Sequence, residues 1–311
     1  MLDLDLIVSN CGVNTDVTPD IVIGNISNLE KEYNSEELIQ IYNYLLTCVK
    51  HPKILVYLIK CTDKYKDESS LGRLVDLLLL KGQLKNSSYE PDELINLRVM
   101  CTKAISNYKD TSVVGALLYC LNNKDEHYKV RLACADALGK IGDKYAVAPL
   151  IELVQDENEK SVYLKESAAS ALGALGDARA IDPLVSILEA KQGFWDKFSF
   201  LKERVIEALG KLNVNNKKVI VALKSSLMDS SPLVRINAIE AIMNSDEEHA
   251  AEYIKECLKD EVNEVQKNAL IAMYNLEGRD ILDEVLSNRE YSEYLKEEAK
   301  SLMDEYENTD E

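Results

Sequence analysis

The sequence predicts an all-α protein, a right-handed α-solenoid in which antiparallel helical hairpins stack one on the next. Three observations support this prediction. A short motif recurs along most of the 311-residue chain, and each copy carries apolar residues at the spacing of a helix with one buried face. The chain also has only 12 Gly and 6 Pro, too few for a turn-rich β architecture.

The recurring motif is clearest in the middle of the chain. The stretch VRLACADALGKIGD, from Val130 to Asp143, returns as LKESAASALGALGD, from Leu164 to Asp177. Its apolar positions fall at i, i+3 or i+4, i+7 or i+8, and i+11, as expected for an amphipathic helix. Looser copies begin at Leu97, Leu201, Val234, Val265 and Leu295.

A second amphipathic stretch lies between successive copies, as in residues 145–154 and 180–188. Each has a Pro near its start, where a helix loses nothing by lacking an N–H. Successive copies are 33, 34, 37, 33, 31 and 30 residues apart, a period typical of solenoids with two helices per unit. Each unit is therefore predicted to be a helical hairpin. Gly139 and Gly173 are predicted to let neighbouring helices approach closely.

The two central copies resemble HEAT repeats, in particular the short variety found in phycobilin lyases and called PBS-lyase HEAT-like repeats. The resemblance extends over residues 94–306 and weakens towards the C-terminus, where the Gly is lost and Gln266 replaces the basic residue. It implies a HEAT-like superhelix in which the second helix of each unit lines the concave surface. Residues 307–311 then form an acidic tail.

Residues 1–93 follow the pattern less closely. Four helices are predicted there, near residues 18–32, 35–49, 52–65 and 69–82. Thr18 is predicted to be the N-cap of the first of them and Pro19 its first helical residue. The region is predicted to be either a set of degenerate repeats or a distinct helical cap, because a terminal unit of a solenoid turns one face to water.

The composition limits location and partners. The start, MLDLDLIVSN, lacks a basic segment ahead of its apolar residues and does not predict a secretory signal, and no apolar run is long enough to cross a membrane. Seven scattered cysteines without a CxxC pair favour reduced thiols and a cytoplasmic location.

Most of the net charge of −18 lies after residue 245, where 21 acidic residues stand against 7 basic ones. This charge disfavours nucleic acid as a partner and leaves open a well-solvated surface or a docking face for a basic protein.

A basic residue recurs near the start of the motif, at Arg98, Arg131, Lys165, Lys202, Arg235 and Lys296. Acidic residues precede it by six positions twice, Asp125 before Arg131 and Asp229 before Arg235. The HEAT resemblance implies that such Asp and Arg side chains pair within and between neighbouring repeats, as a structural ladder. A ligand-binding stripe is the alternative.

Five positions after the basic residue, the repeats carry a series of mostly polar side chains. The series is Lys103, Asp136, Ser170, Glu207, Glu240, Ile271 and Ser301. If the second helices line the concave surface, these residues point towards a bound partner. Their mixed polarity favours recognition of a protein or peptide over recognition of a polyanion.

No arrangement of residues in the sequence predicts catalysis, a cofactor or a metal site. His51, His127 and His249 are isolated, and there is no HExxH, His-Glu repeat or His/Cys pair at ligand spacing. The His-Glu motifs through which the HEAT-repeat deoxyhypusine hydroxylases hold iron are therefore missing. The GxxG runs that end at Gly142 and Gly176 are predicted to terminate helices.

One stretch breaks both the period and the residue usage of the chain. GFWDKFSF, residues 193–200, holds all three Phe and the only Trp, inside the unit whose spacing is 37 residues. In one interpretation, Phe198 and Phe200 begin the next helix and pack against it, while Trp195 covers the hairpin end. In the other, Phe194 and Trp195 stand on a protruding loop and anchor a partner. The basic residues that follow favour an acidic patch on that partner.

The predicted function is that of a non-enzymatic scaffold or adaptor, monomeric or part of a hetero-complex, that binds a protein or peptide on its concave face. The candidate partner-binding residues are Phe194, Trp195, Phe198, Lys103, Asp136, Ser170, Glu207 and Glu240. No cofactor, nucleic acid or membrane is expected to bind. The alternative, implied by family resemblance alone, is a bilin-lyase-like or other protein-modifying enzyme or its subunit.

Overall fold

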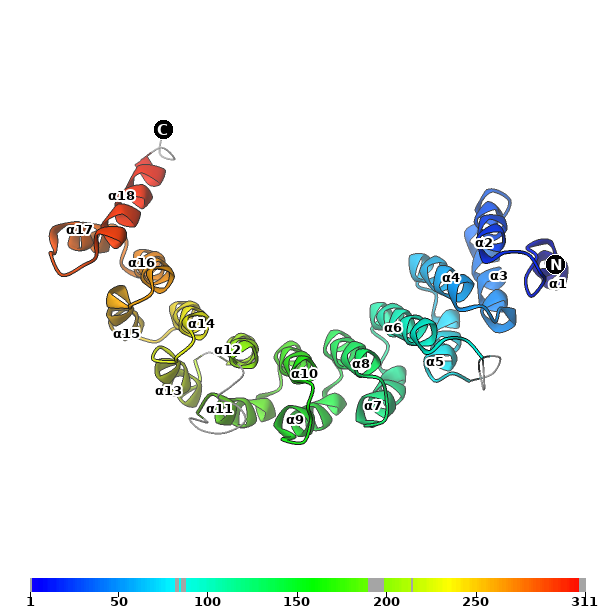
Figure 1. The fold of residues 1–311 in the computed structure, drawn as a ribbon, viewed down its shortest axis with the longest axis horizontal. Helices are drawn as coiled ribbons and strands as arrows, with labels where there is room; N and C mark the ends of the chain where they lie inside the picture. The colour runs from blue at the N-terminus through cyan, green and yellow to red at the C-terminus, as the bar shows by residue number, and fades with distance from the viewer. Residues whose placement is uncertain (1, 82–83, 85–87, 190–198, 214, 308–311) are drawn as a thin grey trace. The chain divides into compact units, whose positions relative to one another are not determined.

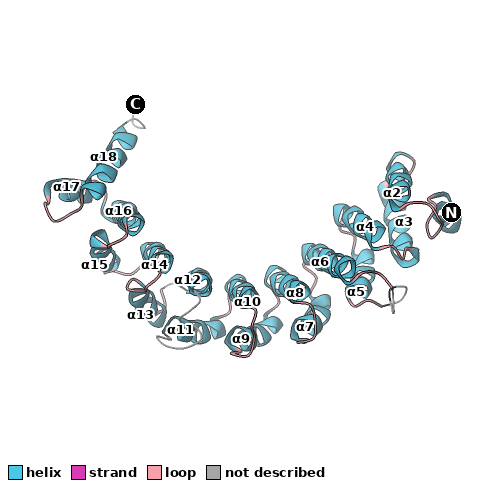
Figure 2. Cartoon of the chain, viewed as in Figure 1, coloured by secondary structure: helices cyan, strands magenta, loops and turns pink. Residues whose placement is uncertain are grey.

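The computed structural model describes residues 2–81, 84, 88–189, 199–213 and 215–307, and this part of the chain folds into helices and turns without a strand (Figures 1 and 2). Its first α-helices are α1 Leu4–Asn10, α2 Pro19–Asn28, α3 Ser35–Cys48, α4 Pro52–Tyr65, α5 Leu71–Leu78, α6 Pro91–Tyr108, α7 Val114–Asn122, α8 Tyr128–Ile141 and α9 Val147–Gln155. The remainder are α10 Val162–Leu175, α11 Ile181–Glu189, α12 Ser199–Asn213, α13 Lys217–Ser226, α14 Pro232–Met243, α15 Ala250–Lys255, α16 Asn263–Glu277, α17 Asp280–Ser287 and α18 Glu293–Glu307. None of these described helices is long and apolar enough to cross a membrane.

The chain divides into two compact units, Met1–Pro149 and Leu150–Glu311. In each unit, consecutive helices form hairpins, and the second helices of successive hairpins pack side by side. These second helices are α2, α4, α6 and α8 in the first unit and α10, α12, α14, α16 and α18 in the second. The predicted α-solenoid is thereby confirmed. The domain boundary predicted after residue 93 falls inside α6 and remains a prediction about repeat regularity.

The N-terminal helices lie close to their predicted positions. Thr18 is the N-cap of α2 and Pro19 its first residue, and a 3₁₀ turn, Leu29–Lys31, extends this helix to the predicted end. Helices α3 and α4 end within one residue of the prediction, whereas α5 ends four residues early, at Leu78. Helix α1 was not predicted, because its seven residues bury a single side chain, Ile7, and show no apolar stripe.

Two glycines end second helices and set the direction of the chain into the next hairpin. Gly142 and Gly176 adopt φ of 86° and 65°, the left-handed conformation that glycine allows at a helix C-terminus. Asp143 and Asp177 follow directly. Their carboxylates accept the backbone N–H two residues later, at 2.8 and 3.0 Å, and so cap the next helical turn. The predicted role of the GxxG runs as helix ends is confirmed.

Candidate functional site

A polar side chain near the start of the second helices reaches back to the end of the preceding helix. Arg98 of α6 donates from Nε to the carbonyl oxygen of Leu78 at 2.6 Å, and Arg131 of α8 donates to that of Leu121 at 2.8 Å. These bonds satisfy carbonyl groups that a helix terminus leaves without an intrahelical partner. In the second unit, equivalent bonds run from Lys165 to Asp156, from Arg235 to Asp229 and from Gln266 to Asp260.

The same side chains also join neighbouring hairpins. Arg98 holds Glu126, in the turn between α7 and α8, through two bonds of 2.7 and 2.5 Å, and both side chains are 11% exposed. Such a two-pronged guanidinium–carboxylate pair has a fixed geometry, so it aligns one hairpin with the next. In the second unit, Lys202 pairs with Asp229 and Arg235 with Asp260, both at 2.7 Å, and Ser292 donates to Gln266 at 2.6 Å.

Of the two acids that the HEAT resemblance implies for this ladder, Asp229 belongs to it and Asp125 does not. Asp125 is exposed, and its neighbour Glu126 is the acid that turns inward. The pair that forms is therefore Arg98 with Glu126, between two hairpins, rather than Asp125 with Arg131 within one. In this turn the backbone N–H of Asp125 donates to the Asn123 side chain at 3.1 Å, whereas the Glu126 carboxylate accepts the backbone N–H of His127 at 2.8 Å.

Asp229 does contact Arg235, but through its backbone. Its carbonyl oxygen accepts from the Arg235 guanidinium at 2.8 Å, while its carboxylate binds Lys202 and caps the N–H of Ser231 at 2.9 Å. Asp229 and Arg235 thus both take part in a chain of contacts that links three hairpins, with Asp260 as the acid that Arg235 holds.

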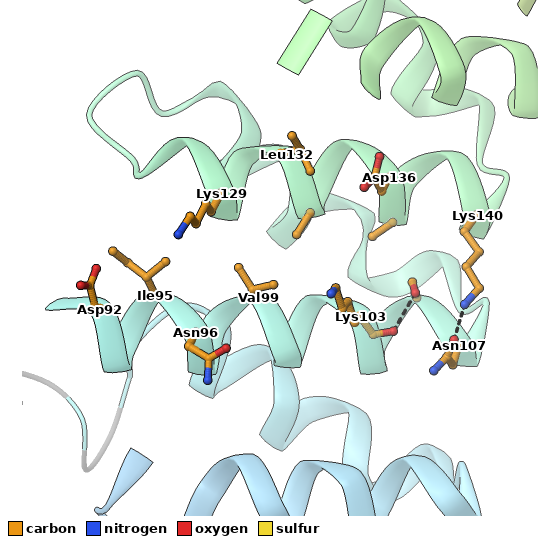
Figure 3. A pocket seen from close by; sticks show the side chains of 13 residues that line it. Asp92, Ile95, Asn96, Val99, Lys103, Asn107, Lys129, Leu132, Asp136 and Lys140 are labelled. Atoms are coloured by element: carbon orange, nitrogen blue, oxygen red, sulfur yellow. Dashed lines mark hydrogen bonds between the residues drawn. The ribbon is translucent and has the colours of Figure 1, made fainter. Parts of the chain in front are cut away.

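A groove of about 850 Å³ lies between α6 and α8 (Figure 3). Ile95 and Val99 of α6 and Leu132 of α8 form its floor as half-buried aliphatic side chains. Lys103 and Asp136, both expected from the repeat register to face a partner, line the same groove, one on each helix. The structure therefore brings these two residues together at one apolar-floored site.

The aliphatic floor is the part of this site that the repeat register does not reveal. Val99 and Leu132 directly follow the ladder residue of their copies, a position that Glu166 and Glu203 occupy in the next two copies. An aliphatic residue at a position where the next copies of the motif carry a charged residue is the sequence signal that could have located the groove.

One repeated position lines the α6–α8 groove in one copy and makes a close helix contact in another. In the second unit, Gly173 of α10 faces Ala208 of α12 so closely that a Cβ on Gly173 would lie 2.8 Å from the Ala208 Cα. The equivalent residues of α6 and α8 are Ser106 and Ala137, and both line the groove. Ser106 carries a side chain at the position where Gly173 has none. The close approach predicted for Gly173 is confirmed.

A smaller groove of about 350 Å³ lies between α12 and α14. It is lined by Glu207 and Glu240, two further residues that the register predicts. Hydrogen bonds from Lys211 at 2.7 Å and from Arg204 at 2.8 Å lower the pKa of the Glu207 carboxyl group. The negative charge of Glu207 is thus balanced by two basic residues of its own helix, α12. Asn237 and Asn244 add two amides and Ile206 is its one large aliphatic residue, so this groove offers less apolar surface than the α6–α8 groove.

Of the remaining predicted partner-binding residues, the structure describes only Ser170, which lines neither groove. Ser170 is half-buried on α10, and Phe194, Trp195 and Phe198 lie outside the described residues. Phe200 is described, as the second residue of α12, and is 63% exposed. The interpretation in which Phe200 packs against its own helix is therefore wrong for this residue, because the buried face of α12 begins one residue later, at Leu201.

The histidines stand at helix N-termini. His51 and His127 accept the backbone N–H of Lys53 and Lys129 through Nδ1, at 3.2 and 3.3 Å, and so cap α4 and α8. His249 precedes α15 without such a bond. Across the described ranges, no group of three or more His, Cys, Asp or Glu side chains has a geometry that could hold a metal ion.

Comparisons with known proteins identify the repeat. The family model of the HEAT repeats matches residues 88–164, 116–199 and 196–274. The crystal structure of Kap121p is similar at a TM-score of 0.52 and 14% identity, over 95% of this chain and 36% of that one, a likeness of fold alone. No curated protein matches the sequence.

Two further similar structures correct the prediction that the chain is not an enzyme. Human deoxyhypusine hydroxylase is 15% identical, with a TM-score of 0.36, over 88% of this chain and 97% of that one. The complex of CpcE and CpcF of phycocyanin lyase from Nostoc sp. PCC7120 is 20% identical, with a TM-score of 0.40, over 94% and 96%. Since both are enzymes, excluding enzymes was wrong. Likeness at this level assigns neither activity to this chain.

Proposed function

The chain belongs to the HEAT-repeat family, and we propose that it acts as a scaffold that binds a protein partner through a segment seated in the α6–α8 groove. The partner class, a protein or peptide, is the one that the mixed polarity of the second helices predicts. A cytoplasmic site of action remains a prediction from the cysteine content.

The observation that supports the proposal most directly is the aliphatic floor of the α6–α8 groove. Ile95, Val99 and Leu132 are left half-buried between two helices whose outer positions are polar. Burying apolar surface contributes roughly 25 cal/mol per Å² removed from water, so a segment that covers this floor gains affinity there. An apolar centre with a polar rim is also the usual composition of a protein interface.

The distribution of charge is compatible with a protein ligand in the first unit. Residues 1–149 carry 17 Lys and Arg against 20 Asp and Glu, whereas residues 150–311 carry 19 against 34. The groove therefore belongs to the nearly neutral part of an acidic chain. Residues 1–149 as a whole lack the concentration of positive charge that a nucleic-acid backbone requires, which supports a protein partner.

The test uses the full-length protein and a phage-displayed library of random peptides. Peptides that bind are synthesised, and their affinities are compared between the wild type and the double variant Val99→Ser, Leu132→Ser. We expect the double variant to bind about tenfold more weakly or worse, because two aliphatic contacts are lost and tenfold corresponds to about 1.4 kcal/mol.

A matched control comes from the smaller groove. Asn237→Ala with Asn244→Ala changes two residues that line the α12–α14 groove, and it should leave the affinities unchanged. Thermal melting checks that both double variants remain folded. Peptides that bind the Val99→Ser, Leu132→Ser protein as tightly as the wild type would show that the α6–α8 groove is not the binding site.

A further inference from the structure

We propose that the α6–α8 groove selects partner segments that carry carboxylates beside their aliphatic residues, so that the partner is a short acidic amphipathic segment. This inference rests on the proposed function, because it names the chemistry of the partner at the same groove. It follows from three lysines at the rim of the groove, from the charge around them and from the length of the two helices.

The lysines flank the aliphatic floor. Lys129 of α8 lies above Ile95 at one end, and Lys103 of α6 and Lys140 of α8 lie towards the other (Figure 3). Lys140 donates a hydrogen bond to Asn107. Lys103 and Lys129 are exposed, and neither ammonium group has a hydrogen-bond or ion-pair partner in the part of the chain that the structure describes. Two cations are thus available at opposite ends of one apolar floor.

The lysines outnumber the acids at this rim. Two carboxylates, Asp92 and Asp136, line the groove against the three lysines. Asp92 is in the first turn of α6, where the helix dipole already favours a negative charge. A groove with excess positive charge in a chain of net charge −18 is a local reversal of sign. Charge complementarity therefore favours a segment that is acidic next to its apolar face.

The long-range field of the chain does not cancel this preference. At physiological ionic strength, charges separated by more than about 8 Å are largely screened, so a bound segment responds mainly to the groove rim. Within the unit that contains the groove, residues 1–149, basic and acidic residues are nearly balanced, at 17 against 20. A basic segment, by contrast, would bring its cations close to Lys103 and Lys129, and like charges at this range repel.

The lining residues also limit the length of the segment. Along α6 they run from Asp92 to Asn107, about 22 Å at 1.5 Å per residue, and along α8 from Lys129 to Lys140, about 16 Å. A helix of three to four turns matches this length. The volume of about 850 Å³ holds several aliphatic side chains but not a whole helix, so one face of the segment is buried and its flanking residues meet the lysines.

The experiment measures the binding of three labelled peptides to the full-length protein by fluorescence anisotropy. Each peptide has about 14 residues, roughly four helical turns, and the same row of Leu and Ile on one face. The flanking positions carry Glu in the first peptide, Gln in the second and Lys in the third. We expect the Glu peptide to bind at least about tenfold more tightly than the Lys peptide in low salt, and the gap to shrink as salt is raised.

A charge reversal in the protein provides a second and more specific test. The double variant Lys103→Glu, Lys129→Glu should invert the order of the Glu and Lys peptides. Because both lysines are exposed and unpaired among the described residues, its melting temperature should stay near that of the wild type. Lys217→Glu, a change at an exposed lysine of the second unit, should leave the order intact.

The outcomes separate the inference from the proposed function. Equal binding of the three peptides, lost in the Val99→Ser, Leu132→Ser variant, would keep the groove as a binding site and overturn its preference for acid. Failure of all three peptides to bind, with a folded protein, would overturn the groove itself. An order that persists after reversal of both lysines would place the preference elsewhere and also overturn the inference.

Discussion

Lys165 of α10 shows how burial and bonding oppose each other at a ladder position. Its side chain is fully buried, and its Nζ donates to the Asp156 carbonyl oxygen at 2.5 Å. Burial lowers the pKa of Lys165 from its ordinary value of 10.5 to about 8, although the nearby carboxylates of Asp156, Glu159 and Glu157 act in the opposite direction. An ammonium group in this position is therefore less stable than the same group in the unfolded chain.

This shift predicts a specific dependence of stability on pH. Between about pH 8 and 10.5, the unfolded chain still holds a proton that folded Lys165 has released, so the free energy of unfolding rises with pH across this window. In Lys165→Arg the side chain stays charged and contributes no such rise. The wild type should thus gain up to about 3 kcal/mol relative to the variant, at about 1.36 kcal/mol per pKa unit.

Urea denaturation of both proteins at a series of pH values measures the difference. Cysteines and tyrosines titrate in the same range, but they do so equally in the two proteins, and the comparison removes them. Parallel pH profiles for the wild type and Lys165→Arg would show that Lys165 stays protonated in the folded protein.

At the scale of helix pairs, one glycine contact controls how closely neighbours approach. Replacing Gly173 by Ala puts a methyl group 2.8 Å from the Ala208 Cα and 3.0 Å from its Cβ. The obstacle is backbone, so α10 and α12 must move apart. We expect a loss of roughly 1 to 3 kcal/mol of stability from this overpacking, measured by denaturant unfolding.

Gly210→Ala is the matched control within the same pair of hairpins. Gly210 is also inside a helix, α12, but a Cβ there meets nothing within 4 Å. Since Ala has a higher helix propensity, this variant should gain about 0.5 to 1 kcal/mol. If the two alanine variants changed stability in the same direction, the close contact of Gly173 would not be a determinant of packing.

The positions of most helices could be predicted because their signals are local. Thr18 with Pro19 marks a helix start, and Gly142 with Asp143 marks a helix end followed by a cap, whatever the rest of the chain does. The register of the repeats likewise placed Lys103 and Asp136 on adjacent second helices. Each of these inferences needs only the spacing along one or two helices.

The partners of the ladder and the floor of the groove could not be predicted in the same way. Whether Asp125 or Glu126 turns inward depends on the backbone of one turn, which one sequence does not determine. Ser106 and Gly173 occupy equivalent positions, and the close contact of Gly173 appears only when the residue that it faces, Ala208, is known. Sequence periodicity gives the face of a helix, whereas a groove depends on the distance between two helices.

At the scale of the whole molecule, the two units differ in charge and share the same kind of packing. In a solenoid, each hairpin contacts its neighbours in the stack, so stability is approximately a sum of local terms. Within each unit of this chain, the row of second helices and the ladder supply those terms. Damage to one hairpin is therefore expected to spread to adjacent hairpins and to leave distant ones folded.

Leu138→Asp tests this expectation, since Leu138 of α8 is fully buried and a carboxylate in its place has no partner. The cost should be about 4 kcal/mol or more, enough to open the hairpins around α8. Hydrogen exchange should then show lost protection in α6 and α8 and retained protection in α14 and α16. Lys129→Asp adds the same side chain to an exposed position of α8 and should preserve protection throughout. Loss of protection along the entire described chain in Leu138→Asp would mean that the solenoid unfolds as one cooperative unit, and unchanged protection would mean that Leu138 does not face the core.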